Sequence, residues 1–337
     1  MAYDLSNTLV VCISSRALFD MSESDNLFRQ LMADDPENAI QRYREFMFAH
    51  EDEHLNPGTG YPLVKALLEL NKPRPLEEAA PLVEVVVMSR NSPETGVQVL
   101  NTIRRDGLDI SRFAFTGGEP PADYLDAFNV DLFLTTHVED AQTVADLRTC
   151  AVAVLREPPE NGQEIPENQV RLAFDGDAVL FSEDSELVFK TQGLRAFQKL
   201  ENDNQDVPLA EGPYATLLKK LAALQNKLEQ MHKVSSVRIA LVTSRNSPSE
   251  MRVIKTLRSW GVQVDEAFFL GGVDKTRFLK AFNPHIFFDD MDVHLERAAS
   301  CVPTAKVPYG SDSRLADKSN VVLKQSEKSE KMNKQTG

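Results

Sequence analysis

Short apolar segments alternate along the chain with longer segments whose apolar residues recur at helical spacing. In the C-terminal half, the apolar runs predict β-strands at about residues 170–175, 238–243, 264–270 and 285–289. Helical patterns lie between them at about 249–260 and 274–282, and a further helix is marked by Leu217, Leu221, Leu224 and Leu228. Strands that alternate with helices indicate βαβ units, so we expect an α/β fold with mainly parallel sheets.

The sequence repeats itself at an offset of about 155 residues. Residues 89–93 and 244–248 share the identical sequence Ser-Arg-Asn-Ser-Pro, and 127–129 recurs as 281–283. Earlier in the chain, residues 15–19 align with 177–181. A period of this length predicts two domain-sized copies and not a solenoid.

Composition suggests where the copies begin and end. Residues 1–155 form the first copy, and the stretch 156–169, rich in Pro, Glu and Asn, is the expected linker. The second copy covers 170–310. The polar, lysine-rich residues 311–337 are expected to form a mobile tail. We therefore predict two duplicated Rossmann-like domains.

Carboxylates gather where strands of the second copy are predicted to end. Asp175 and Asp177 flank Gly176 after the first strand, and Asp289-Asp290 end the last one. A parallel sheet brings these ends to one edge, where the side chains would repel one another unless a hard cation neutralised them. An all-oxygen ligand set of this kind favours Mg²⁺ over zinc.

Two further side chains at this edge would complement a phosphate dianion, namely a hydroxyl and a lysine. Thr243 is preferred to Ser244 because it ends the apolar run, and Lys275 is preferred to the competing Lys280. The segment 244–246 could equally cap the next helix, so its arginine receives no catalytic role.

The same residues resemble a known superfamily. Residues 174–181, 242–243, Lys275 and 287–290 match, in order, the four motifs of haloacid dehalogenase-like phosphohydrolases. Segments that resemble cytosolic 5′-nucleotidases of type I are 173–182, 257–261, 285–290 and 307–310, with 14–19 and 129–134 in the first copy. The resemblance covers roughly residues 8–310.

The resemblance implies roles for the candidate residues. Asp175 is expected to be the nucleophile, and Asp177 the acid and base. Thr243 and Lys275 would hold the phosphoryl group, and the metal ligands would be Asp175, the backbone carbonyl of Asp177, and Asp289 or Asp290. Residues 183–236 lie where the superfamily inserts a small helical cap. The implied function is Mg²⁺-dependent hydrolysis of nucleoside 5′-monophosphates such as AMP or IMP, through an aspartyl-phosphate.

The first copy lacks this chemistry. Aligned by sequence, Ile13 and Ser15 replace the acidic pair, Met88 replaces Thr243, Pro121 replaces Lys275, and Thr135-Thr136 replace the last two carboxylates. We expect a catalytically silent partner domain.

Three alternatives stay open or are set aside. The substrate could be another small phosphomonoester, since fold and motifs do not determine the leaving group. A phospho-accepting signalling receiver uses similar groups, but there the acidic pair precedes a lone acceptor. The pattern His50-Glu-Asp-Glu-His54 fits a zinc protease, but Asn56-Pro57-Gly58 stops any helix that would carry both histidines.

Charge and composition limit the partners. A net charge of −14 argues against non-specific nucleic-acid binding. No apolar run reaches the length of about 18 residues that a membrane span requires, and the N-terminus lacks signal-peptide order. Cys12, Cys150 and Cys301 are too widely spaced for a disulfide framework, so we expect a cytoplasmic protein. A homo-oligomer is compatible with the sequence, which does not determine subunit number.

Overall fold

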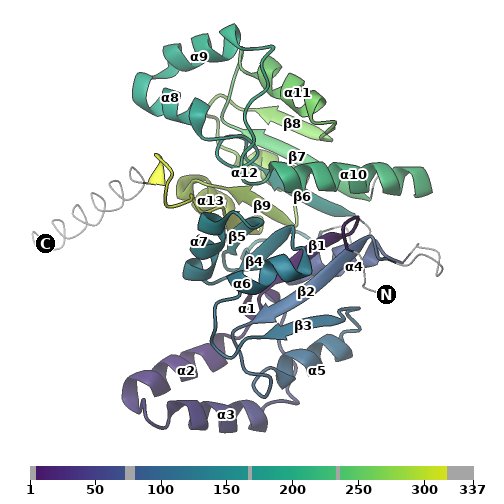
Figure 1. The fold of residues 1–337 in the computed structure, drawn as a ribbon, viewed down its shortest axis with the longest axis vertical. Helices are drawn as coiled ribbons and strands as arrows, with labels where there is room; N and C mark the ends of the chain where they lie inside the picture. Colours follow the sequence, from purple (N-terminus) through teal and green to yellow (C-terminus); the bar gives the residue numbers. More distant parts are fainter. Residues whose placement is uncertain (1–4, 73–79, 166–168, 233–235, 317–337) are drawn as a thin grey trace, which may run out of the picture.

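Strands from both halves of the chain join in one sheet. The computed structural model describes residues 5–72, 80–165, 169–232 and 236–316. Over these residues, the sheet has ten strands in the order β3-β2-β1-β4-β5-β10-β9-β6-β7-β8 (Figure 1). The strands of the first half are β1 (Leu9–Ile13), β2 (Val83–Ser89), β3 (Arg112–Phe115), β4 (Leu132–Thr135) and β5 (Ala151–Leu155). Those of the second half are β6 (Val170–Phe174), β7 (Val237–Thr243), β8 (Glu266–Phe269), β9 (Ile286–Asp289) and β10 (Thr304–Lys306).

The two halves run in opposite directions. Within each half, neighbouring strands are parallel, but β5 and β10 pair antiparallel, with Ala305 opposite Leu155 and Lys306 opposite Val154. The strands of each half follow one another in the same spatial order. The carboxyl edge of the second half therefore lies on the same side of the sheet as the amino edge of the first.

The mixed α/β class and the mainly parallel sheet are confirmed. The four predicted strands correspond to β6, β7, β8 and β9, and each observed boundary lies within two residues of the predicted one. The predicted helices at 249–260 and 274–282 correspond to α11 (Glu250–Ser259) and α12 (Thr276–Phe282). The strands of the two predicted domains nevertheless share a single sheet, because β5 and β10 pair where the halves meet.

Helices cover both faces of the sheet and complete a three-layer arrangement. In the first half they are α1 (Ser15–Leu18), α2 (Ser22–Asp34), α3 (Ala39–Ala49), α4 (Tyr61–Glu69), α5 (Val97–Arg105), α6 (Ala122–Leu125), a 3₁₀ turn (Asp126–Phe128) and α7 (Val138–Leu147). The second half adds α8 (Asp184–Gln192), α9 (Leu194–Asp203), α10 (Ala215–His232) and α13 (Asp292–Ala298) to α11 and α12.

The hydrophobic core is continuous across the junction of the two halves on one face only. Alternate residues of β1 face opposite sides, so Val11 and Ile13 join one cluster and Val10 and Cys12 another. The first cluster extends through both halves beneath α4, α5, α10 and α11. On the other face, α6 and α7 cover a separate cluster in the first half, and α12 and α13 cover one in the second. This burial on both faces explains the uninterrupted apolar runs of the central strands.

Helix pairs extend from the sheet at opposite ends of the molecule: α2 and α3 in the first half, α8 and α9 in the second (Figure 1). Of the helices described within the predicted cap segment 183–236, α8 and α9 extend in this way. Helix α10 instead packs on the sheet, where Leu217, Leu221 and Leu228 are almost fully buried. It contacts β1 as well as β7, and so connects the halves.

The predicted linker and tail are partly described. Arg156 follows β5 and donates its amide to the carbonyl of Thr304, so the chain stays on the sheet as it leaves the first half. In the predicted tail, Ser311 and Asp312 bond to the first half, Ser313 and Arg314 bond to residues 183–184 of the second half, and Leu315 is buried. The remaining tail residues, 317–337, lie outside the described residues.

We expect the isolated fragment 165–337 to be poorly soluble. Removing the first half would leave β10 without its neighbour β5 and would expose the continuous core on one face, creating a sheet edge and an apolar patch prone to association. Soluble yield and gel filtration, compared with residues 1–316, measure this. A monomeric, cooperatively folding fragment would contradict the expectation.

Candidate active site

The carboxyl ends of three adjacent strands bring the predicted residues together. β6 lies between β7 and β9, so Asp175, Thr243 and Asp289 end neighbouring strands. The amide of Asp175 donates to the carbonyl of Phe288 at 2.8 Å, which continues the strand pairing up to the site. Gly176 then passes close to the Thr243 hydroxyl: a Cβ at this position would lie 3.2 Å from Thr243 Oγ1.

Three carboxylates form one buried cluster. Asp175, Asp289 and Asp290 each offer an oxygen, and these oxygens lie within 4.8 Å of one another. Lys275 Nζ donates to Asp175 Oδ1 and to Asp289 Oδ2, each at 2.7 Å. Since Lys275 is only 3% exposed, its charge offsets part of the buried negative charge. One ammonium beside three carboxylates still leaves the cluster net negative.

Asp290 has one oxygen bound and one free. Oδ2 accepts a hydrogen bond from the hydroxyl of Tyr309, and Lys306 Nζ donates to the backbone carbonyl at 2.5 Å. Oδ1 is buried and has no hydrogen-bond partner. A buried carboxylate oxygen without a donor is costly, and a cation in the cluster would remove that cost. The donor set consists of oxygens only, so the residues fit a hard divalent cation.

The pKa values of the cluster reflect this crowding. Burial raises the pKa of Asp175 to about 7, with Lys275 opposing the shift and Asp289 adding to it. Burial and nearby carboxylates, foremost Glu186, also raise the pKa of Asp290. For Asp289, the effect of burial is outweighed by Lys275 and His294, which lower its pKa. Burial and mutual repulsion thus oppose the ionisation of all three carboxylates at once when no cation is bound.

Asp177 lies outside the carboxylate cluster. Its two oxygens accept from Arg245 Nε and Nη2, at 2.8 and 2.6 Å. The remaining nitrogen of Arg245 donates to Glu201 Oε2 at 2.6 Å, and Glu201 on α9 is fully buried. Ser185 of α8 donates to Glu201 Oε1 at 2.7 Å. The expected acid/base is thereby connected to both projecting helices.

Arg245 is the site residue that sequence reasoning missed. Its side chain is 2% exposed, and the guanidinium lies 5.3 Å from the ring centroid of Phe197 and 5.9 Å from that of Phe181. The identical repeat at 89–93 and 244–248 gives no direct signal for this role, because the strand register matches Arg245 to Asn91: the amide of Gly271 donates to the carbonyl of Arg245 as that of Gly117 does to Asn91.

The competing candidates lie away from the cluster. Lys280 and Ser244 are exposed, whereas Lys275 and Thr243 are buried. The zinc pattern is not formed, since α3 ends at Ala49, before either histidine. His50 contacts the carbonyl of Phe46, and His54 contacts Asp106. Within the described ranges, the carboxylate cluster is the single group of three or more possible metal ligands.

The strand register corrects two equivalences in the first half. The amide of Ser14 donates to the carbonyl of Leu134, as Asp175 does to Phe288, so Ser14 and not Ile13 occupies the nucleophile position. Ser89 pairs with Phe115 as Thr243 pairs with Phe269, so Ser89 and not Met88 matches the hydroxyl.

The reason for the shift is that the first half has one residue fewer in the turn after the strand, which displaces a sequence alignment. The hydroxyls of Ser15 and Ser89 share one hydrogen bond, with their oxygens 2.9 Å apart. The positions that match Asp175 and Thr243 therefore carry hydroxyls in this half.

Comparison with known proteins agrees with this geometry. The family model described as 5′-nucleotidase matches residues 1–314. Human (Homo sapiens) cytosolic 5′-nucleotidase 1B is 35% identical over 299 residues, which make up 87% of this chain and 47% of the relative. The chain thus spans about half the length of this curated relative.

We expect Arg245→Met to destabilise the protein by about 3 kcal/mol, because it leaves Asp177 without its buried cation and Glu201 with Arg252 as its remaining one. Urea denaturation measures the loss. Arg314→Met is the matched control: Arg314 pairs with Asp184 at 3.3 Å, but both side chains are about two-thirds exposed, so the cost should stay below about 1 kcal/mol. Equal losses in the two variants would contradict the structural role of Arg245.

Proposed function

Because the chain belongs to the 5′-nucleotidase family, we propose that it hydrolyses nucleoside 5′-monophosphates, such as AMP or IMP, to nucleoside and phosphate. The reaction is Mg²⁺-dependent and passes through an aspartyl-phosphate. The observation that carries this proposal is the buried cluster of Asp175, Asp289 and Asp290 beside Lys275, at the carboxyl edge of a parallel sheet. Ligands bind at such edges in open α/β sheets.

The proposal includes the duplicated haloacid dehalogenase-like fold. Two observations support this fold. The strands of the two halves have the same spatial order, and each half has a helix pair between its first and second strands, α2 and α3 or α8 and α9. Residues 1–155 are the silent copy and 170–310 the catalytic one, with 156–169 between them. The cap function belongs to α8 and α9.

Asp175 and Asp177 divide the chemistry between them. A carboxylate oxygen of Asp175 bonds to phosphorus while the bond to the nucleoside 5′-oxygen breaks, and Asp177 gives that oxygen its proton. Asp177 then takes a proton from water, whose oxygen attacks phosphorus. Phosphate leaves and the Asp175 carboxylate is restored. Thr243 and Lys275 hold the phosphoryl oxygens.

Asp175, Asp289 and Asp290 would hold Mg²⁺, with the backbone carbonyl of Asp177 as a further ligand. When bound, the cation supplies positive charge opposite the transferring phosphoryl group. Its charge also removes the need for protons on the buried carboxylates.

Arg245 holds Asp177 in a defined orientation. In the structure each of its oxygens accepts one hydrogen bond from Arg245, so each keeps a further acceptor position. Arg245 is held in turn by Glu201 of α9. A displacement of the helix pair α8 and α9 on substrate binding would therefore change the partners of Asp177.

The proposal also covers the location of the protein and its partners. None of the helices in the described part of the chain is both long and apolar enough to cross a membrane. We place the protein in the cytoplasm, with a small-molecule substrate and no nucleic-acid partner. Family membership favours turnover over a phospho-accepting receiver, and a long-lived aspartyl-phosphate without phosphate release would reverse that preference.

Asp175→Asn should abolish phosphate release from nucleoside monophosphates, because an amide cannot act as the nucleophile. Thermal melting should show an intact fold. The exposed Asp206→Asn serves as the control and should retain full activity. Residual activity of the Asp175 variant above about a hundredth of wild type would contradict the assignment, since acid/base steps alone contribute about 10²–10⁴-fold.

Activity should be lost in EDTA, return with Mg²⁺ or Mn²⁺, and resist zinc-selective chelation. The apparent Mg²⁺ affinity should also rise between about pH 6 and pH 8. The pKa of Asp175 is raised to about 7 in the metal-free cluster, so protons compete with the cation below that pH. Isothermal titration calorimetry at several pH values measures this. Full activity in EDTA, or an affinity that falls as the pH rises, would refute the metal site.

A further inference from the structure

The segment that follows β10 connects the carboxylate cluster to the first half of the molecule. α7 runs back from the carboxyl end of β4 and ends near the start of β5, on the side of the sheet where the cluster lies. Gln142 Nε2 on this helix donates to the carbonyl of Tyr309 at 2.8 Å. Asp146, one turn later, accepts from the amide and the hydroxyl of Ser311, both at 2.7 Å.

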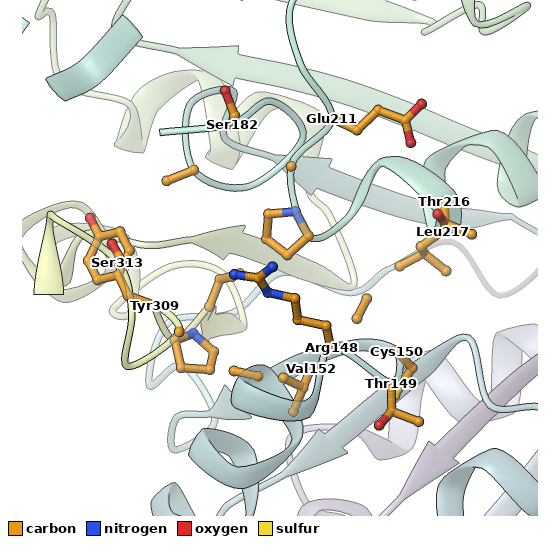
Figure 2. A pocket seen from close by; sticks show the side chains of 18 of the residues that line it. Arg148, Thr149, Cys150, Val152, Ser182, Glu211, Thr216, Leu217, Tyr309 and Ser313 are labelled. Atoms are coloured by element: carbon orange, nitrogen blue, oxygen red, sulfur yellow. The ribbon is translucent and has the colours of Figure 1, made fainter. Parts of the chain in front are cut away.

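Tyr309 is half-buried, and both its backbone carbonyl and its hydroxyl are hydrogen-bonded. A cavity of about 600 Å³ lies between the two halves, and Tyr309 forms part of its wall. Figure 2 shows Tyr309 and Ser313 on one side of this cavity, with Arg148 of the first half facing them. The hydrogen bonds to its carbonyl and from its hydroxyl therefore contribute to the position of the partly enclosed ring.

The hydroxyl of Tyr309 makes the two oxygens of Asp290 inequivalent. It donates to Oδ2, while Oδ1 remains buried and without a partner. A carboxylate that can rotate presents either oxygen, but one that is hydrogen-bonded through Oδ2 presents Oδ1 in a defined direction. Groups that orient a metal ligand in this way contribute about 10- to 100-fold to metal affinity.

We propose that the first half of the chain takes part in metal binding: α7 positions Tyr309, and Tyr309 orients the free oxygen of Asp290 toward the cation. Tyr309, Gln142 and Asp146 are thus positioning residues, and the copy without catalytic carboxylates contributes to the site from outside it. This inference rests on the proposed metal site.

The test is the affinity of the full chain for Mg²⁺, measured by isothermal titration calorimetry, and for Mn²⁺, measured by electron paramagnetic resonance, both without substrate. Tyr309→Phe keeps the ring and removes only the hydroxyl, so affinity should fall about 10- to 100-fold. Gln142→Met removes the donor to the Tyr309 carbonyl and should weaken binding about two- to fivefold, the scale of one net hydrogen bond.

The matched control is Arg148→Met. Arg148 pairs with Asp312 of the same segment at 2.5 Å, but both side chains are more than 70% exposed, so metal affinity should not change. Thermal melting of each metal-free variant excludes unfolding as the cause of any loss.

The outcomes separate the inference from the function on which it rests. If the wild-type chain binds neither cation, the proposed metal site fails and the inference fails with it. If wild type binds and Tyr309→Phe binds equally well, the orienting role is overturned while the metal site stands. If Tyr309→Phe is weakened but Gln142→Met equals Arg148→Met, the contribution of the first half is overturned.

Discussion

The need to bury several carboxylates at one point governs the arrangement of the second half. The donors to the satisfied oxygens come from several elements of the second half. Lys275, which precedes α12, serves both Asp175 and Asp289, while the backbone after β9 serves Asp289 again. The loop after β10 supplies Tyr309 to Asp290. These elements must meet at the sheet edge because unpaired charge there is costly.

The antiparallel pairing of β5 with β10 brings the first half next to the loop that donates to Asp290. Since β5 and β10 run in opposite directions, the carboxyl edge of one half adjoins the amino edge of the other. The C-terminal part of α7 therefore meets the loop after β10. A parallel junction would have placed that helix end on the far side of the sheet. The presence of a half without the carboxylate cluster is thus intelligible in physical terms: it closes the core and contacts a loop of the half that carries the cluster.

Arg245 ties the expected acid/base to the projecting helices. Its guanidinium bridges Asp177 and Glu201, and the surrounding rings of Phe181 and Phe197 exclude water from the pair. In such surroundings a bidentate ion pair holds its geometry firmly. The state of the helix pair α8 and α9 and the availability of Asp177 are therefore linked through one side chain.

Local pattern alone determined much of this protein. Apolar runs and helical periodicity located β6 to β9, α11 and α12, because burial on two faces leaves an uninterrupted signal in the sequence. The order of the acidic, hydroxyl and lysine positions identified Asp175, Thr243, Lys275 and Asp289 as neighbours, since parallel strands bring their carboxyl ends together.

Tertiary structure alone decided which oxygens and charges are compensated. Nothing in the local sequence around Arg245 distinguishes a helix cap from a buried partner of Asp177 and Glu201. The pairing of β5 with β10 and the contact of α7 with Tyr309 join residues more than 100 positions apart. Such long-range contacts depend on how the two halves pack against each other. The hydrophobic periodicity within either half does not predict that packing.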